Sequence, residues 1–205
     1  MEQQLLDACE NGNVEEVKQL LRHPTINPNI NELEYQRTPL YIACDKGYID
    51  LVELLLNDER IDINREYGDG YTPLGNACEK GHIEIVKLLL NDKRIDVNKV
   101  DPNEITPFYL VCDYGHIEIV KLLLNDERVD VNKAMNGGST PIYMACQNGY
   151  IDIVKLLLND ERVDVNKADS DGQTPFSIAC QNSHIEIVIL FLGTLRGFFF
   201  FFNPK

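Results

Sequence analysis

Cysteine and histidine are the residues of this sequence best suited to chemistry, and both recur at a fixed interval. Six cysteines could form a disulfide framework, bind zinc or sense oxidants. They stand 35 residues apart once and 34 residues apart thereafter, at Cys9, Cys44, Cys78, Cys112, Cys146 and Cys180. Each follows Ala or Val, which favours one small buried apolar side chain in each of six equivalent structural units. Redox sensing is the alternative.

The regular spacing argues against a site that several cysteines share. Equivalent positions in stacked helical units lie ~8–10 Å apart. A disulfide requires Cα atoms closer than about 7 Å, and a zinc ion requires four donors within ~2.3 Å of one point. We therefore expect neither disulfides nor a metal site.

The histidines occupy a position that also accepts tyrosine. His82, His116 and His184 stand at one point of the interval, where Tyr48 and Tyr150 stand in other units. Such a position serves packing or hydrogen bonding rather than metal binding. The sequence also lacks a Ser-His-Asp set, a phosphate-binding glycine loop and paired carboxylates outside the periodic pattern. We expect a protein that is not an enzyme, with no catalytic residue and no cofactor.

Two short helices and a long polar loop are predicted for each interval. Thr38 is a candidate N-cap, Pro39 suits the first helical position, and Gly47 suits the left-handed residue that ends a helix. Residues 49–56 then carry apolar side chains at helical spacing. Helices of roughly nine residues are marginal alone in water, so each must pack against neighbouring units. The Thr-Pro pair, which the first unit lacks, begins at Thr38, Thr72, Thr106, Thr140 and Thr174.

The segments 38–44 (Thr-Pro-Leu-Tyr-Ile-Ala-Cys) and 47–56 resemble the ankyrin repeat, and the resemblance covers about residues 1–192. It implies an all-α ankyrin-repeat solenoid of stacked helix-turn-helix units with protruding loops. We expect a repeat domain over residues 1–195, with atypical first and last units, and a Phe-rich tail over 196–205.

Two features depart from the family pattern. The period is 34 rather than the usual 33 residues, because Asn-Asp-Glu-Arg-Ile-Asp (57–62) replaces a shorter turn. The family's histidine after Thr-Pro-Leu, which normally braces the loops, is replaced by Tyr41, Gly75, Tyr109, Tyr143 and Ser177. We expect the third unit to be the weakest, because Gly75 offers no side chain for this role.

The charge balance restricts the partners. The 205 residues carry a net charge of −14, whereas nucleic-acid binding needs clustered Lys and Arg. The same charge disfavours docking on an anionic membrane. The first residues show no secretory pattern, so we expect a cytoplasmic protein.

The resemblance implies that a partner protein binds the concave face formed by the loops and the exposed ends of the first helices. We expect Tyr35, Tyr71, Ile105 and Tyr114 to form its centre, and an acidic ring to favour a partner with a basic patch. The alternatives are that each tyrosine covers its own loop, and that the chain is a structural spacer or a fragment of a longer array. The full set of partner-binding candidates is Tyr35, Arg37, Asp45, Lys46, Asp69, Tyr71, Glu79, Lys80, Asn103, Ile105, Asp113, Tyr114, Ser139, Gln147 and Asn148.

One loop asparagine per unit is a second candidate. The resemblance implies that this residue can be hydroxylated by an oxygen-dependent enzyme, while the alternative is an asparagine that ties its turn by hydrogen bonds. The candidates are Asn64, Asn98, Asn132 and Asn166.

The last unit is unusual because Ser183 replaces the turn glycine and Ile189 replaces a lysine. Residues 198–202 are five phenylalanines. Three interpretations remain open: a membrane anchor, a cap folded back on the last helix pair, or a sticky end that a partner or self-association covers. The apolar stretch 187–202 would span only ~24 Å of a ~30 Å hydrocarbon core, which disfavours the anchor.

Overall fold

The computed structural model describes residues 1–32, 36–68 and 70–202, with side chains as far as residue 193. Two compact units divide the chain, Met1–Pro107 and Phe108–Lys205. Every regular element in the described residues is a helix. The expectation of an all-α fold built from helix-turn-helix units is therefore confirmed.

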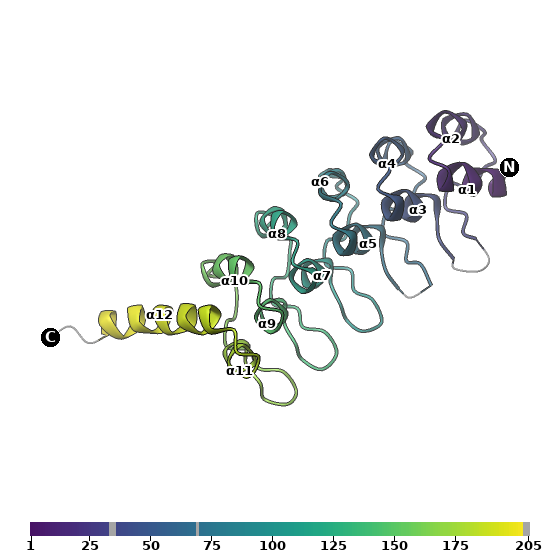
Figure 1. Ribbon diagram of the computed structural model, residues 1–205. Coiled ribbons are helices and arrows are strands. Elements are labelled where there is room, and N and C mark those ends of the chain that lie inside the picture. Colours follow the sequence, from purple (N-terminus) through teal and green to yellow (C-terminus); the bar gives the residue numbers. More distant parts are fainter. Residues whose placement is uncertain (33–35, 69, 203–205) are drawn as a thin grey trace. The chain divides into compact units, whose positions relative to one another are not determined.

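The first compact unit contains three helix pairs (Figure 1). They are α1 (Glu2–Glu10) with α2 (Val14–Leu21), α3 (Pro39–Lys46) with α4 (Ile49–Leu56), and α5 (Pro73–Lys80) with α6 (Ile83–Asn91). The first helices stack in the order α1, α3, α5, and the second helices in the order α2, α4, α6.

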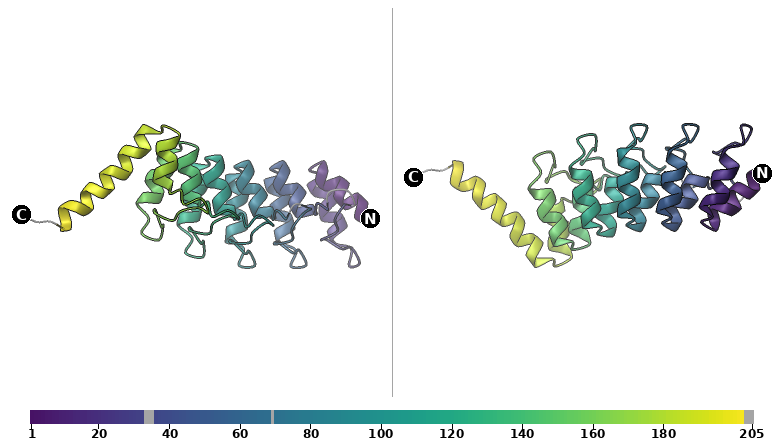
Figure 2. Two further views of the ribbon diagram at one scale, coloured as in Figure 1. Left: turned by 90° about the horizontal axis from the view of Figure 1, so that it is seen from below. Right: turned by 90° about the horizontal axis from the view of Figure 1, so that it is seen from above.

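The second compact unit repeats this arrangement with α7 (Pro107–Tyr114) and α8 (Ile117–Leu124), α9 (Pro141–Gln147) and α10 (Ile151–Leu158), and α11 (Pro175–Gln181) and α12 (Ile185–Phe202). Helix α11 packs on α9, and α10 lies between α8 and α12. In each unit the long loops project beyond the first helices (Figure 2).

The first helices begin and end as the sequence predicts. The Thr38 hydroxyl accepts a hydrogen bond from the Tyr41 amide at 3.2 Å, and Pro39 occupies the first helical position. Gly47 ends α3 in the left-handed conformation, with φ 74°. Thr72 and Gly81 do the same for α5.

The cysteines fill the interior, with one exception. Five are buried, and burial raises the pKa of Cys9 and of Cys146 to about 12. Since the thiolate is the reactive form, these thiols are inert at neutral pH. The prediction of a buried cysteine is wrong for Cys180, which is exposed. Its equivalent Cys146 lies in α9, on which α11 packs, and the described residues contain no helix pair that packs on α11 in the same way.

The turn that makes the period 34 residues long, equivalent to residues 57–62, forms hydrogen bonds with the preceding repeat. Arg94 pairs with Asp92 at 2.6 Å and donates to the carbonyl oxygen of Leu56 at 2.9 Å. Leu56 is the last residue of α4, and the last carbonyls of a helix lack intrahelical partners. Arg94 therefore caps the second helix of the preceding repeat.

Two further arginines make the same cap. Arg60 donates to Leu21 O at 2.8 Å, and Arg162 donates to Leu124 O at 2.6 Å. Hydrogen bonding to the arginine lowers the pKa of the paired carboxyl group, as in Asp58 and Asp160.

The last helix differs from the others in length. Helix α12 has 18 residues, and the other helices have seven to nine. It continues without a break to Phe202, so the backbone of residues 196–202 is helical. The five phenylalanine side chains lie outside the described side chains, so the interpretation as a folded-back cap stays a prediction. The predicted domain boundary at 195/196 lies within α12. In the part of the chain that the structure describes, no helix is long and apolar enough to cross a membrane.

Candidate protein-interaction surface

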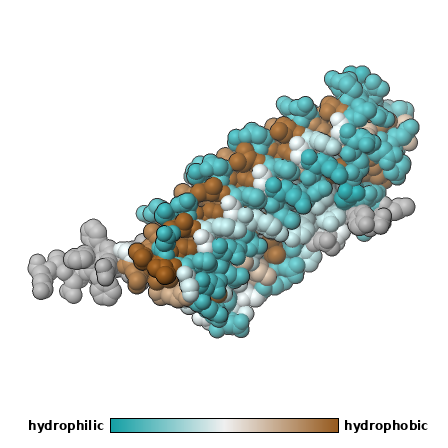
Figure 3. Space-filling model, viewed as in Figure 1, coloured by the Kyte–Doolittle hydropathy of each residue, from teal (hydrophilic) through white to brown (hydrophobic). Residues whose placement is uncertain are grey.

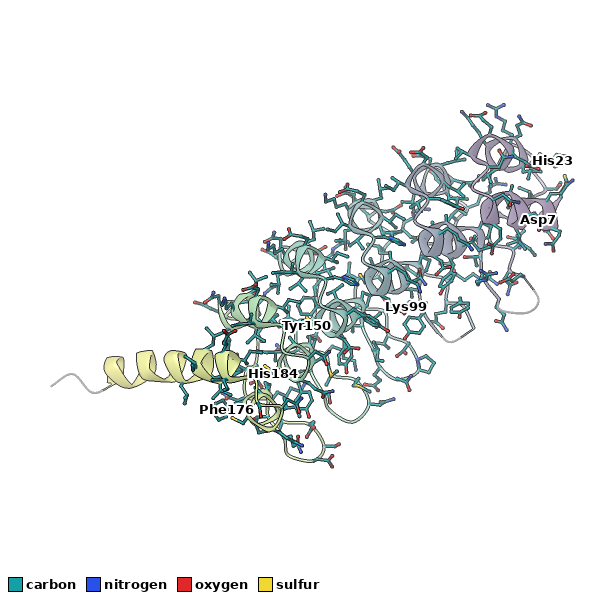
Figure 4. All side chains as sticks on the ribbon, viewed as in Figure 1. Asp7, His23, Lys99, Tyr150, Phe176 and His184 are labelled. Atoms are coloured by element: carbon teal, nitrogen blue, oxygen red, sulfur yellow. The ribbon has the colours of Figure 1, made fainter. Side chains whose placement is uncertain are left out.

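Within each compact unit, tyrosine and histidine rings at the starts of second helices pack on glycines of the preceding repeat, as for Tyr48, His82, Tyr150 and His184. A Cβ added to Gly47 would lie 3.1 Å from the His82 ring, and one added to Gly149 would lie 2.6 Å from the His184 ring. The His184 Nε2 atom lies 3.0 Å from the carbonyl oxygen of Gln147. Figure 4 labels His184 and Tyr150 at the starts of α12 and α10. The predicted packing and hydrogen-bonding role is confirmed for these residues.

The tyrosines that replace the family's loop-bracing histidine also reach other parts of their compact unit. The Tyr41 ring stacks on the Tyr67 ring with centroids 4.3 Å apart. The Tyr109 hydroxyl lies 2.9 Å from Met135 Sδ. Burial raises the pKa of Tyr41 and of Tyr109, so both remain neutral hydrogen-bonding groups.

The third repeat lacks this tyrosine and compensates with an amide. Asn76 is buried, next to Gly75, at a position where α3 has Ile42. Its Nδ2 atom donates to the Tyr41 hydroxyl at 2.7 Å and to Asp45 Oδ1 at 3.3 Å. Its Oδ1 atom is buried without a hydrogen-bond partner. A buried unpaired acceptor costs about 1–3 kcal/mol, which agrees with the expectation that this repeat is the weakest.

In the first compact unit, some of the predicted partner-binding residues form hydrogen bonds or ion pairs with other residues of the chain. Arg37 hydrogen-bonds to Glu32 and pairs with Glu10 at 2.9 Å. Lys46 is exposed and lies 3.3 Å from the same Glu10 carboxylate. Asp45 accepts the Asn76 hydrogen bond described above.

The remaining candidates of this unit lie at the loop and helix surface. Tyr71, Glu79 and Ile105 are half-buried, whereas Lys80 and Asn103 are exposed. The Asn103 and Ile105 amides both donate to Asp101 Oδ1, at 2.9 and 2.8 Å. Tyr35 and Asp69 lie outside the described residues.

In the second compact unit, Tyr114 is the most accessible aromatic candidate. Its side chain is 49% exposed, and its ring lies parallel to that of His116 with centroids 6.3 Å apart. Asn148 is exposed and donates to both the carbonyl oxygen and the carboxylate of Asp113, at 2.8 and 2.9 Å. Gln147 and Ser139 are half-buried.

The predicted partner-binding residues come from both compact units. The sequence did not show which of them form hydrogen bonds between neighbouring repeats. Asp45, Asp113 and the Gln147 carbonyl contribute to such ties. The exposed candidates among the described residues are Lys46, Lys80, Asn103, Tyr114 and Asn148.

The loop asparagines join consecutive turns. Asn64 Nδ2 donates to Arg94 O at 2.7 Å, and Asn64 Oδ1 accepts from the Asp96 amide at 2.8 Å. Asn132 makes the same pair of bonds with Arg162 O and the Asp164 amide, at 2.6 and 2.7 Å. These bonds support the structural interpretation of the asparagines, and their hydroxylation stays a prediction. The described residues contain no His, Cys, Asp and Glu group suited to holding a metal ion.

The sequence analysis missed the arginine caps, although the signal was present. Arg60, Arg94, Arg128 and Arg162 follow the same 34-residue interval as the cysteines, and Arg196 continues it. Only the structure shows that Arg60, Arg94 and Arg162 reach the end of a helix in the preceding repeat.

Repeated helix pairs, capped by Thr-Pro and tied by turn residues, define the chain as a helical repeat protein. The family model described as ankyrin repeats (3 copies) matches residues 4–67, 59–135, 77–169 and 108–197. The chain belongs to the ankyrin repeat family.

Among solved structures, the crystal structure of EF0377, an ankyrin repeat protein, is similar with a TM-score of 0.85 and 29% sequence identity. The match covers 91% of this chain and 95% of that chain. The comparison with curated proteins found no match. Ankyrin repeats are generally non-enzymatic modules for protein–protein interaction.

Proposed function

We propose that this chain binds a partner protein through the exposed ends of its first helices and the loops beside them. The supporting observation is Tyr114, which is 49% exposed at the end of α7. The equivalent residues Lys46, Lys80 and Asn148 are polar, so the fold does not require a tyrosine there. Tyrosine is enriched among residues that dominate binding energy.

The partner of this proposal carries a basic patch and meets the protein in the cytoplasm. The chain has a net charge of −14, and Asp45, Glu79 and Asp113 stand at equivalent ends of first helices. Charges of this kind raise the association rate more than the affinity. Added salt should therefore slow association and leave the dissociation rate nearly unchanged.

The proposal is tested by the substitution Tyr114→Asn. Asparagine occupies this position in the two last repeats, at Asn148 and Asn182, so the variant keeps the fold. We expect partner proteins captured by the wild-type chain from its source cell to be lost or weakened at least tenfold. Lys121→Ala, on the exposed surface of α8, serves as the control and should capture them normally.

Equal capture by the wild-type chain and both variants would contradict the role of Tyr114. If capture also survives changes at Tyr71 and Lys80, the interpretation of the chain as a structural spacer is favoured.

A further inference from the structure

Three asparagines of this chain are followed directly by glycine, at Asn11, Asn136 and Asn148. Such a pair is able to modify itself. The backbone nitrogen of the glycine attacks the side-chain carbonyl carbon of the asparagine, a C–N bond forms, and the side-chain nitrogen leaves as ammonia. Water then opens the resulting succinimide ring to aspartate or isoaspartate. The glycine nitrogen must rotate next to the asparagine side chain, so the folded structure decides which pair reacts.

The structure blocks this rotation at Asn11. This residue ends α1 with helical backbone angles, φ −88° and ψ −3°, and its Nδ2 atom donates to Asp7 O at 2.7 Å. The Gly12 amide donates to Cys9 O at 3.1 Å, and a Cβ added to Gly12 would lie 3.1 Å from the Tyr48 ring. Rotation of the Gly12 nitrogen would therefore break hydrogen bonds that end the helix.

Asn148 is held in the same way. It ends α9 with φ −88° and ψ −5°, and its Nδ2 atom donates to the carbonyl oxygen and the carboxylate of Asp113. A Cβ added to Gly149 would lie 2.6 Å from the His184 ring. The peptide between Asn148 and Gly149 is therefore fixed by the helix end, by side-chain hydrogen bonds and by a packed ring.

The third pair, Asn136 and Gly137, lies in the loop before α9. The Gly138 amide donates to Met135 O at 2.9 Å, so residues 135–138 form a β-turn with this pair at its centre. Both residues are exposed, and a Cβ added to Gly137 would meet nothing within 4 Å. The loops of the second compact unit present mainly hydrophilic surface (Figure 3). Water therefore reaches the pair.

The central peptide of this turn is able to rotate without loss of the closing hydrogen bond. Gly137 has φ 101°, close to the value for the third residue of a type II turn, and types I and II differ mainly in the orientation of the central peptide. Glycine adopts positive and negative φ about equally readily. Rotation therefore brings the Gly137 nitrogen to the Asn136 side chain while the bond from Gly138 to Met135 stays intact.

We propose that Asn136 is a site of spontaneous deamidation in the folded protein, with water as the co-reactant and ammonia as the leaving group, and that the fold protects Asn11 and Asn148. This site is independent of the proposed partner. The attacking nitrogen must lose its proton, so the reaction speeds up as the pH rises.

The modification changes a contact between neighbouring loops. Either product adds a negative charge, and isoaspartate also inserts the β-carbon of residue 136 into the backbone. The Gly137 carbonyl oxygen accepts a hydrogen bond from the Ser170 amide at 2.9 Å. A lengthened backbone shifts this carbonyl, so isoaspartate at position 136 breaks the bond to Ser170.

The first experiment incubates the full chain at mildly alkaline pH, once folded and once in denaturing urea, and follows its tryptic peptides by mass spectrometry. Peptide 134–155 carries both Asn136 and Asn148, so fragmentation compares them in one molecule, and peptide 1–18 carries Asn11. In the folded chain we expect Asn136 to deamidate at least tenfold faster than either of the other two. In urea, where the fold no longer protects them, the three rates should lie close together. Asn136→Ser should abolish the fast reaction.

The second experiment measures the effect on the loop contact by hydrogen exchange. It compares the intact chain, the isoaspartate fraction of the aged chain and freshly prepared Asn136→Asp, which adds the charge without lengthening the backbone. The Ser170 amide should exchange at least tenfold faster in the isoaspartate fraction. In Asn136→Asp it should exchange as in the intact chain.

Two results would overturn the proposal. Equal rates at Asn136 and Asn148 in the folded chain would show that the turn does not expose the pair to reaction. A folded Asn136 that reacts as slowly, relative to the chain in urea, as Asn11 does would show the same. Unchanged exchange of the Ser170 amide in the isoaspartate fraction would overturn the proposed effect on the loop contact.

Discussion

At the scale of single residues, the recurring histidines and tyrosines serve packing between neighbouring repeats. The rings of Tyr48, His82, Tyr150 and His184, at the starts of second helices, lie over glycines of the preceding repeat, as His82 lies over Gly47 and Tyr150 over Gly115. These glycines have positive φ, a conformation that L side chains rarely adopt. Glycine is therefore required for two reasons: the backbone has a positive φ, and the ring occupies the space that a Cβ atom would need.

Two substitutions separate these requirements. Gly149 and Gly172 share φ 77°, but an added Cβ meets the His184 ring at 2.6 Å only at Gly149 and meets nothing within 4 Å at Gly172. We expect Gly172→Ala to lower the free energy of unfolding by about 1 kcal/mol and Gly149→Ala by about 1–2 kcal/mol more, because the ring must move. Urea unfolding followed by circular dichroism measures both. Equal losses of unfolding free energy in the two variants would show that the contact between Gly149 and the His184 ring does not contribute to stability.

At the scale of elements, the turns after α4, α6 and α10 each connect one repeat to the preceding one. Arg94 connects Asp92 in its own turn with the end of α4. A cation at this place satisfies unpaired carbonyls and interacts favourably with the helix dipole. The longer period relative to the usual ankyrin repeat thus accompanies a helix cap donated by the following repeat.

The cap predicts a specific loss of stability. Arg94→Ala removes the hydrogen bond to Leu56 O and should lower the free energy of unfolding by about 1–2 kcal/mol. Lys93→Ala is the matched control, since Lys93 is exposed in the same turn and carries the same charge. Thermal and urea unfolding of the two variants make the comparison. A similar loss in both would assign the effect to net charge rather than to the cap.

At the scale of the whole molecule, stability comes from contacts between neighbouring repeats, because a lone helix pair cannot bury its apolar side. In the second compact unit, Ala145 and Cys146 of α9 have no exposed surface, whereas Cys180 of α11 is exposed. A terminal repeat with one neighbour is held by fewer contacts than an internal repeat.

Hydrogen exchange should show this difference directly. Backbone amides of α11 should exchange at least tenfold faster than those of α9. Mass spectrometry of peptides from the two helices measures the rates. Equal protection would mean that α11 is stabilised by something other than repeat stacking.

The sequence by itself determined the repeat and its helices, because Thr-Pro caps, helix-ending glycines and apolar spacing act locally. It also predicted that the histidines and all six cysteines are structural, since positions that recur once per repeat cannot converge on one point, and five of the six cysteines are buried as predicted. Only the tertiary structure decided which polar residues are exposed and which tie repeats together, as with Asp45 and Asp113. It alone showed that Cys180 is exposed, because exposure depends on which neighbour is present and every repeat carries a cysteine at this position.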